Sequence, residues 1–87
     1  KYITNLLILD KSSSSKYEIE FLNSHQFRNL SFELISCKTI EFDKYFDTAA
    51  LLKITQNDKI FIGWFFKYTD RLNLYSNKIY EISLTNC

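Results

Sequence analysis

One histidine and two cysteines are the residues of this 87-residue chain best suited to nucleophilic or metal chemistry. A nucleophilic site needs a thiol or hydroxyl beside a base, and a zinc site needs three or four His, Cys or carboxylate ligands. His25 lies in the polar stretch 23–27, between two expected strands, which predicts an exposed loop histidine. No spacing supports a dyad of His25 with Cys37. We therefore expect neither a nucleophilic nor a metal site.

Paired carboxylates are the remaining candidates for catalysis. Glu18 and Glu20 fall on one parity of an expected strand, where a solvated face accounts for both. Asp43 and Asp47 would lie one turn apart if residues 43–52 are helical, a spacing that suits acid–base chemistry. Helix capping and solvent exposure explain the two Asp residues equally well and require no special arrangement. A single glycine does not make a phosphate-binding loop. We predict no enzyme activity, no catalytic residue and no cofactor.

The two cysteines are predicted to form a disulfide. Pairing of Cys37 with Cys87 would close a loop of about 50 residues, which the chain-entropy model values at about 4 kcal/mol. Such bonds persist outside the cytoplasm, so the protein would be secreted, periplasmic or at the cell surface. A second interpretation stays open: in a reducing cytosol the same residues are a buried thiol and a terminal thiol.

Length and charge restrict the classes of function. A chain of this length supports one domain, and we expect it to span residues 1–87. The net charge is +1 and the 11 basic residues form no run, which argues against generic nucleic-acid binding without excluding it. The apolar runs are far shorter than the roughly 20 residues of a membrane helix. Since the chain contains no Met, we expect a product or fragment from which an N-terminal signal or anchor has been removed.

Apolar and polar residues alternate along much of the chain, and this pattern predicts β-strands. Residues 16–21 alternate cleanly. Residues 30–42 do so with an interruption near Cys37, which predicts a bulge, a bend or two separate strands. In the second half we expect four successive antiparallel strands with turns of Asn, Asp and Ser, at residues 51–55, 59–68, 71–75 and 78–84.

Two segments fit both helix and strand. Residues 43–52 contain helix formers after an Asp cap, and residues 2–9 fit one face of a helix, although their composition favours a strand. The serine run 12–15 reads as an exposed loop. We therefore predict an all-β or α+β fold, a small single domain dominated by an antiparallel meander with at most one or two short helices.

The stretch KIFIGWFFKY, residues 59–68, carries apolar residues on both parities of a strand. One parity is the predicted core face: Ile60, Ile62, Trp64, Phe66 and Tyr68. The other has aromatic rings framed by basic residues and is the predicted partner-binding patch if it is exposed: Lys59, Phe61, Phe65, Lys67 and Arg71. Aromatic patches with a basic rim bind proteins or stacked single-stranded bases.

These features favour a non-enzymatic protein-binding or assembly module outside the cytoplasm. By architecture the chain is similar to the soluble head of a type IV pilin or pseudopilin, which implies a four-strand meander, a C-terminal disulfide and a separate N-terminal anchor. Two alternatives stay open. One is a small viral or mobile-element inhibitor of a host nucleic-acid enzyme, and the other is a single-stranded nucleic-acid binder that uses an aromatic and basic sheet face.

Overall fold

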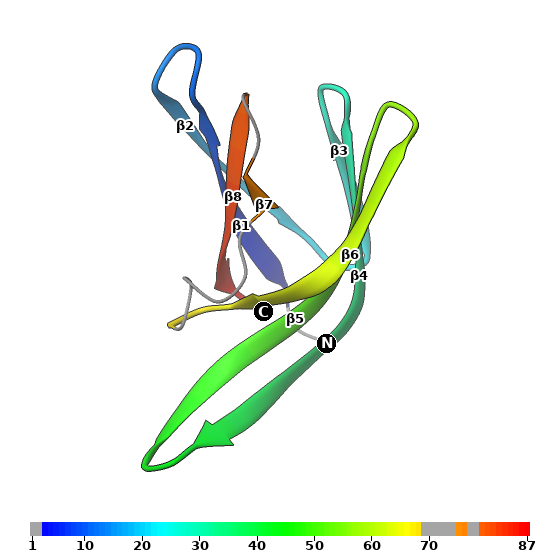
Figure 1. The fold of residues 1–87 in the computed structure, drawn as a ribbon. Coiled ribbons are helices and arrows are strands. Elements are labelled where there is room, and N and C mark those ends of the chain that lie inside the picture. Colours follow the sequence, from blue (N-terminus) through cyan, green and yellow to red (C-terminus); the bar gives the residue numbers. More distant parts are fainter. Residues whose placement is uncertain (1–2, 69–74, 77–78) are drawn as a thin grey trace.

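The computed structural model describes residues 3–68, 75–76 and 79–87. Every regular element in these residues is a β-strand, in which successive side chains point to opposite faces. The elements form two antiparallel four-stranded sheets. No helix occurs in the described residues, so the all-β form of the predicted fold class is confirmed. Figure 1 shows the two sheets facing each other, with the hairpin of β4 and β5 extending beyond them.

Sheet A has the strand order β2-β1-β8-β7. Its strands are β1 (Thr4–Asp10), β2 (Ser15–Phe21), β7 (Tyr75–Ser76) and β8 (Tyr80–Asn86). β1 lies between β2 and β8, and its residues alternate strictly between buried and half-buried. The N-terminal segment is therefore a strand, as its composition favoured, and not a helix.

Sheet B is a continuous meander with the order β3-β4-β5-β6. Its strands are β3 (Ser24–Phe27), β4 (Leu30–Phe42), β5 (Tyr45–Gln56) and β6 (Lys59–Phe66). A bulge between Leu34 and Ser36 leaves Ile35 as the extra residue of β4, which confirms the irregularity expected near Cys37.

One hydrophobic core fills the space between the sheets. Leu6 and Ile8 of β1 and Ile82 of β8 enter it from sheet A, while Phe32 and Leu52 enter it from sheet B. The chain passes between the sheets at the short link from β2 to β3. Around this corner the ring of Phe21 packs against Phe32, with the centroids 6.4 Å apart.

The turns depend on polar residues and not on glycine. Ser14, Arg28, Asp43 and Asn57 have positive φ, and each lies in the turn of a hairpin. Asn and Asp tolerate this left-handed conformation better than most residues. The turn expected between residues 55 and 59 is confirmed at residues 57–58, although Gln56 still belongs to β5. Gly63 lies inside β6 and not in a turn.

Three sequence-based assignments need correction. Residues 45–52 belong to strand β5, because pairing with β4 and β6 outweighs local helix propensity, so the helical alternative is wrong. His25 lies in strand β3, not in a loop, and its ring stacks on Phe21 with centroids 6.1 Å apart.

The succession of strands expected after residue 50 is divided, because β6 is in sheet B and β8 in sheet A. Most of the expected strand at 71–75 lies outside the described residues.

The two faces of β6 are the reverse of the prediction. Ile60 and Ile62 are 60% and 57% exposed, whereas Phe65 is 1% exposed. The register with β5 explains this reversal, because Gly63 lies opposite Leu52 and Phe65 lies opposite Ala50, both of which face the core. Since directly opposite residues share a face, the other parity of β6 points outward.

Candidate protein-binding face

The outward face of sheet B carries a group of apolar residues that the core does not use. Their positions follow from the pairing of β5 with β6, because Leu51 lies opposite Trp64 and Lys53 lies opposite Ile62. Ile35 joins them from the bulge of β4, between the pairs that Leu34 and Ser36 make with β5, and is 48% exposed. We call these residues the outer band: Ile35, Leu51, Ile60, Ile62 and Trp64.

Trp64 is the largest side chain of the outer band and is half-buried. The ammonium nitrogen of Lys38 lies 5.1 Å from the centre of its ring, in the range of a cation–π contact. This contact holds the indole between β4 and β6 without covering it fully. The predicted role of Trp64 in the core is therefore wrong, and an aromatic residue is available on the surface.

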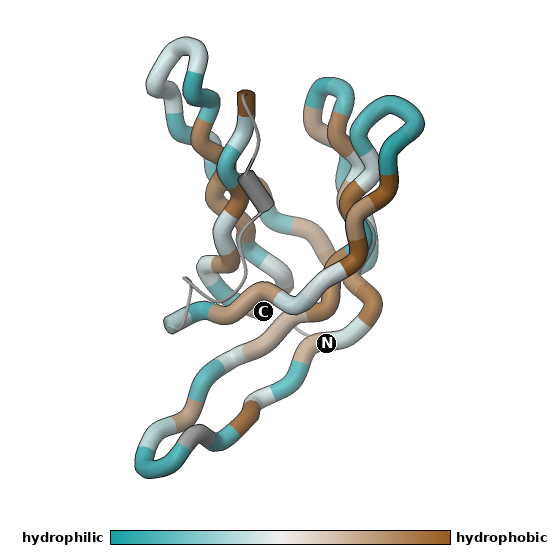
Figure 2. Tube along the Cα trace, viewed as in Figure 1, coloured by the Kyte–Doolittle hydropathy of each residue, from teal (hydrophilic) through white to brown (hydrophobic). Residues whose placement is uncertain are grey.

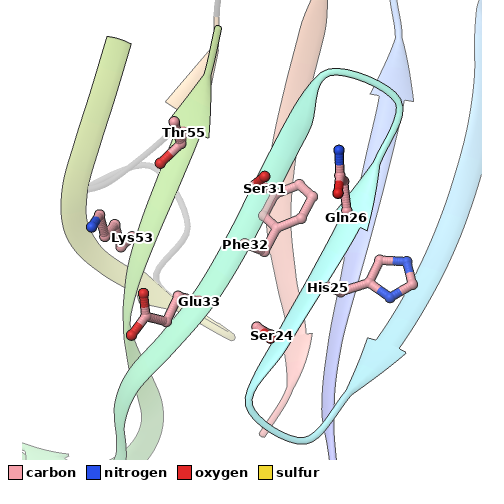
Figure 3. Close-up of a pocket in the computed structure, with 8 residues that line it drawn as sticks. All are labelled: Ser24, His25, Gln26, Ser31, Phe32, Glu33, Lys53 and Thr55. Atoms are coloured by element: carbon pink, nitrogen blue, oxygen red, sulfur yellow. The ribbon is translucent and has the colours of Figure 1, made fainter. Parts of the chain in front are cut away.

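A polar groove of about 440 Å³ borders the outer band on the same sheet. Figure 3 shows its side chains on three neighbouring strands, with His25 pointing away from the rest. The groove adjoins the band because Thr55 and Lys53 lie opposite Ile60 and Ile62. Its lining residues are Ser24, His25, Gln26, Ser31, Phe32, Glu33, Lys53 and Thr55.

The predicted partner-binding patch is not assembled as an exposed surface. Phe65 lies in the core, and Phe61 packs against it edge to face with ring centroids 6.1 Å apart. The Phe61 ring also lies over Gly63, where an added Cβ would stand 2.8 Å from Cζ. Of the flanking cations, Lys59 is exposed and Lys67 is half-buried. Arg71 lies outside the described residues.

Of the four carboxylates considered for catalysis, Asp43 and Asp47 have structural roles and Glu18 and Glu20 are exposed. Asp47 is buried, and its Oδ1 accepts hydrogen bonds from the backbone N–H groups of Thr48 and Tyr68 at 2.7 and 3.0 Å. This carboxylate thereby holds the segment after β6 against β5. Asp43 forms the β4–β5 turn, so the helical pair is not formed. Glu18 and Glu20 lie on the exposed face of β2, as expected. Within residues 3–68, 75–76 and 79–87, no group of His, Cys, Asp and Glu has a metal-binding arrangement.

Sequence reasoning missed an ion pair at the β3–β4 turn, for which no pattern in the chain provides a signal. Arg28, in the β3–β4 turn, donates from Nη1 to Oδ2 of Asp10 at 2.7 Å and from Nη2 to the hydroxyl of Tyr17 at 3.0 Å. Its guanidinium also lies 5.0 Å from the ring centre of Phe27. We call this group, Asp10, Tyr17, Phe27 and Arg28, the Arg28 latch. It joins a turn of sheet B to the first two strands of sheet A.

Cys37 and Cys87 form a disulfide, as predicted, with their Cα atoms 6.2 Å apart. Cys37 lies within β4 opposite Ala50, and Cys87 follows β8. The bond therefore links a central strand of sheet B to the end of sheet A. Among the residues described by the structure, no helix is long and apolar enough to span a membrane.

Comparison with known sequences places this chain in a bacterial family. The family, described as "Uncharacterized protein conserved in bacteria (DUF2155)", matches residues 4–87, and the chain belongs to it. No curated protein and no solved structure matches the chain.

Proposed function

We propose that this member of the DUF2155 family is a non-enzymatic binding or assembly module that docks a protein partner on the outer band, outside the cytoplasm. The observation that carries the proposal is the exposure of Ile60 and Ile62 beside the half-buried Trp64. Single exposed apolar residues are ordinary on protein surfaces, but a contiguous apolar band on one sheet face is typical of an interaction site.

The surroundings of the band match the anatomy of a protein interface. Such interfaces have an apolar centre enriched in aromatic residues and a polar, hydrated rim. Trp64 supplies a large ring of the type that dominates binding energy. The polar groove, with Lys53 and Glu33 among its lining residues, supplies the rim on one side, and Lys38 contributes a cation beside the ring.

The disulfide supports a location outside the cytoplasm, where such bonds are stable. Alkylation of the protein in growing cells with a membrane-permeant maleimide tests this part of the proposal. We expect no thiol to react before reduction and two thiols to react after it. Two reactive thiols without reduction would contradict the location and leave the docking face untouched.

The alternatives receive less support. A stacking surface for single-stranded nucleic acid needed Phe61, Phe65, Trp64 or Tyr75 exposed beside Lys59, Lys67 and Arg71. Phe65 is buried, and a net charge of +1 gives the chain little attraction for a phosphate backbone. A family conserved in bacteria favours a bacterial role over a viral inhibitor. The pilin-like variant required four successive strands in one sheet after residue 50, and these strands are divided between the two sheets.

Site-specific photocross-linking in the native bacterium tests the docking face. A photoreactive amino acid at position 62 or 35 should give a discrete adduct, because both positions are exposed in the outer band. The matched control is position 18, which is exposed on β2 in the other sheet.

A second substitution makes the cross-linking test specific for the band. Ile35→Ser should weaken the adduct formed at position 62, whereas Glu18→Ser should leave it unchanged. The proposal fails if positions 62 and 35 give no adduct from folded protein, or if position 18 gives the same adduct. The mass of the adduct distinguishes a second copy of the chain from a different protein.

A further inference from the structure

Strand β6 forms one edge of sheet B. In the part of the chain that the structure describes, its ladder pairs with β5 alone. An edge strand presents backbone N–H and C=O groups that template pairing with another strand. Figure 2 shows a hydrophobic stretch along the first half of β6, directly after the hydrophilic β5–β6 turn, and Figure 1 shows this half well separated from β8.

Two other sheet edges, β3 and β2, carry the protection that proteins use against unwanted pairing, namely short length or charge. β3 has four residues. β2 is longer, but it displays charged side chains on its exposed face: Lys16, Glu18 and Glu20. β6 has eight residues and no charge or proline after Lys59. This contrast indicates that the edge of β6 is kept for pairing.

We propose that β6 pairs antiparallel with β6 of a second copy of this chain, so that Ile60 of each copy lies opposite Ile62 of the other. The pairing would join two four-stranded sheets into one of eight strands. This inference rests on the proposed function, since it extends the outer band across the edge of β6 onto a second copy of the chain.

The residue pattern of β6 is self-complementary in this register. Ile60 and Ile62 are two positions apart on the same face, so a two-fold axis between them matches isoleucine with isoleucine. Side chains that lie directly opposite each other on one face of a sheet stabilise the pairing of its strands. The net charge of +1 adds little repulsion between copies. Ile60 and Ile62 of both copies would also form one continuous apolar surface.

Engineered cysteines test the register in the purified protein with its native disulfide formed. Directly opposite residues have Cβ atoms about 4.5–5.5 Å apart, whereas diagonal neighbours are about 7–8 Å apart, too far for an unstrained disulfide. A mixture of the Ile60→Cys and Ile62→Cys proteins should therefore give several-fold more disulfide-linked dimer under mild oxidation than either variant alone.

Ser31→Cys is the matched control, because Ser31 is exposed on the same sheet face but lies on an interior strand. It should form little dimer. Sedimentation of the unmodified protein should show concentration-dependent dimers, and Ile62→Lys should abolish them while leaving the circular dichroism spectrum unchanged. The inference is overturned if the mixture cross-links no better than Ser31→Cys, or if the protein sediments as a monomer at all concentrations. A cellular adduct of position 62 with a different protein would then still support the proposed function.

Discussion

Arg28 shows how one side chain can join two sheets. Its side chain is 44% exposed, yet its guanidinium contacts the almost buried carboxylate of Asp10 and two aromatic rings. Exposed ion pairs contribute little to stability. The additional hydrogen bonds of this pair and its buried carboxylate make its contribution larger than that of an exposed pair. Hydrogen bonds from the side chain of Ser12 and then from Arg28 lower the pKa of Asp10 to about 2.

The Arg28 latch predicts a specific loss of stability in acid. The pKa of Asp10 is lower in the folded protein than its ordinary value of 3.8. At pH values between about 2 and 3.8 the unfolded state therefore binds more protons than the folded state. The contribution of Asp10 is therefore complete above pH 4 and is lost as the pH falls through about 2. Urea denaturation of the wild type and of Asp10→Asn at several pH values measures it.

We expect Asp10→Asn to be less stable than the wild type at pH 7 and the difference to shrink at pH 2. The exposed turn residue Asp58 offers a control, since Asp58→Asn should change the unfolding free energy at pH 7 very little. A constant difference between Asp10→Asn and the wild type from pH 7 to pH 2 would contradict the role of the carboxylate.

At the scale of the element, β6 shows which part of the structure sequence patterns could predict. Strict alternation identified β2, and the polar pairs at turns identified the β5–β6 hairpin. In β6 both parities are apolar, so alternation could not assign its faces. Only the register with β5, which sets Phe65 opposite Ala50, decides which parity enters the core. For the same reason the face of β6 that was expected to be exposed, with Phe61 and Phe65, is the one that packs toward the core.

The reversed faces of β6 predict opposite costs for two neighbouring truncations. Phe65→Ala removes a fully buried ring and should cost about 3–5 kcal/mol, a large share of the stability of so small a domain. Trp64→Ala should cost clearly less, because its ring lies half-buried on the outer face. Equilibrium urea denaturation of both variants measures the difference. An equal or larger loss of stability for Trp64→Ala would contradict the assignment of Trp64 to the outer face.

At the scale of the whole molecule, links of different kinds join the two sheets, among them the β2–β3 corner, the Arg28 latch and the disulfide. The sequence could predict the disulfide because the chain has only two cysteines. The assignment of β6 and β8 to different sheets could not be predicted, since local patterns contain no information on which distant strands pair. β1 occupies the centre of sheet A and pairs with β8 across most of the chain length.

The disulfide spans 50 residues, which include all of sheet B after Cys37 and the return into sheet A. Cross-linking stabilises mainly by restricting the unfolded chain, so the Cys37→Ser/Cys87→Ser double variant should lose about 2–5 kcal/mol. Because its unfolded chain is less compact, the variant should also show a steeper dependence of unfolding free energy on urea. The reduced wild-type protein should behave in the same way as the variant. If both retain the stability of the oxidised protein, the disulfide contributes nothing to holding the two sheets together.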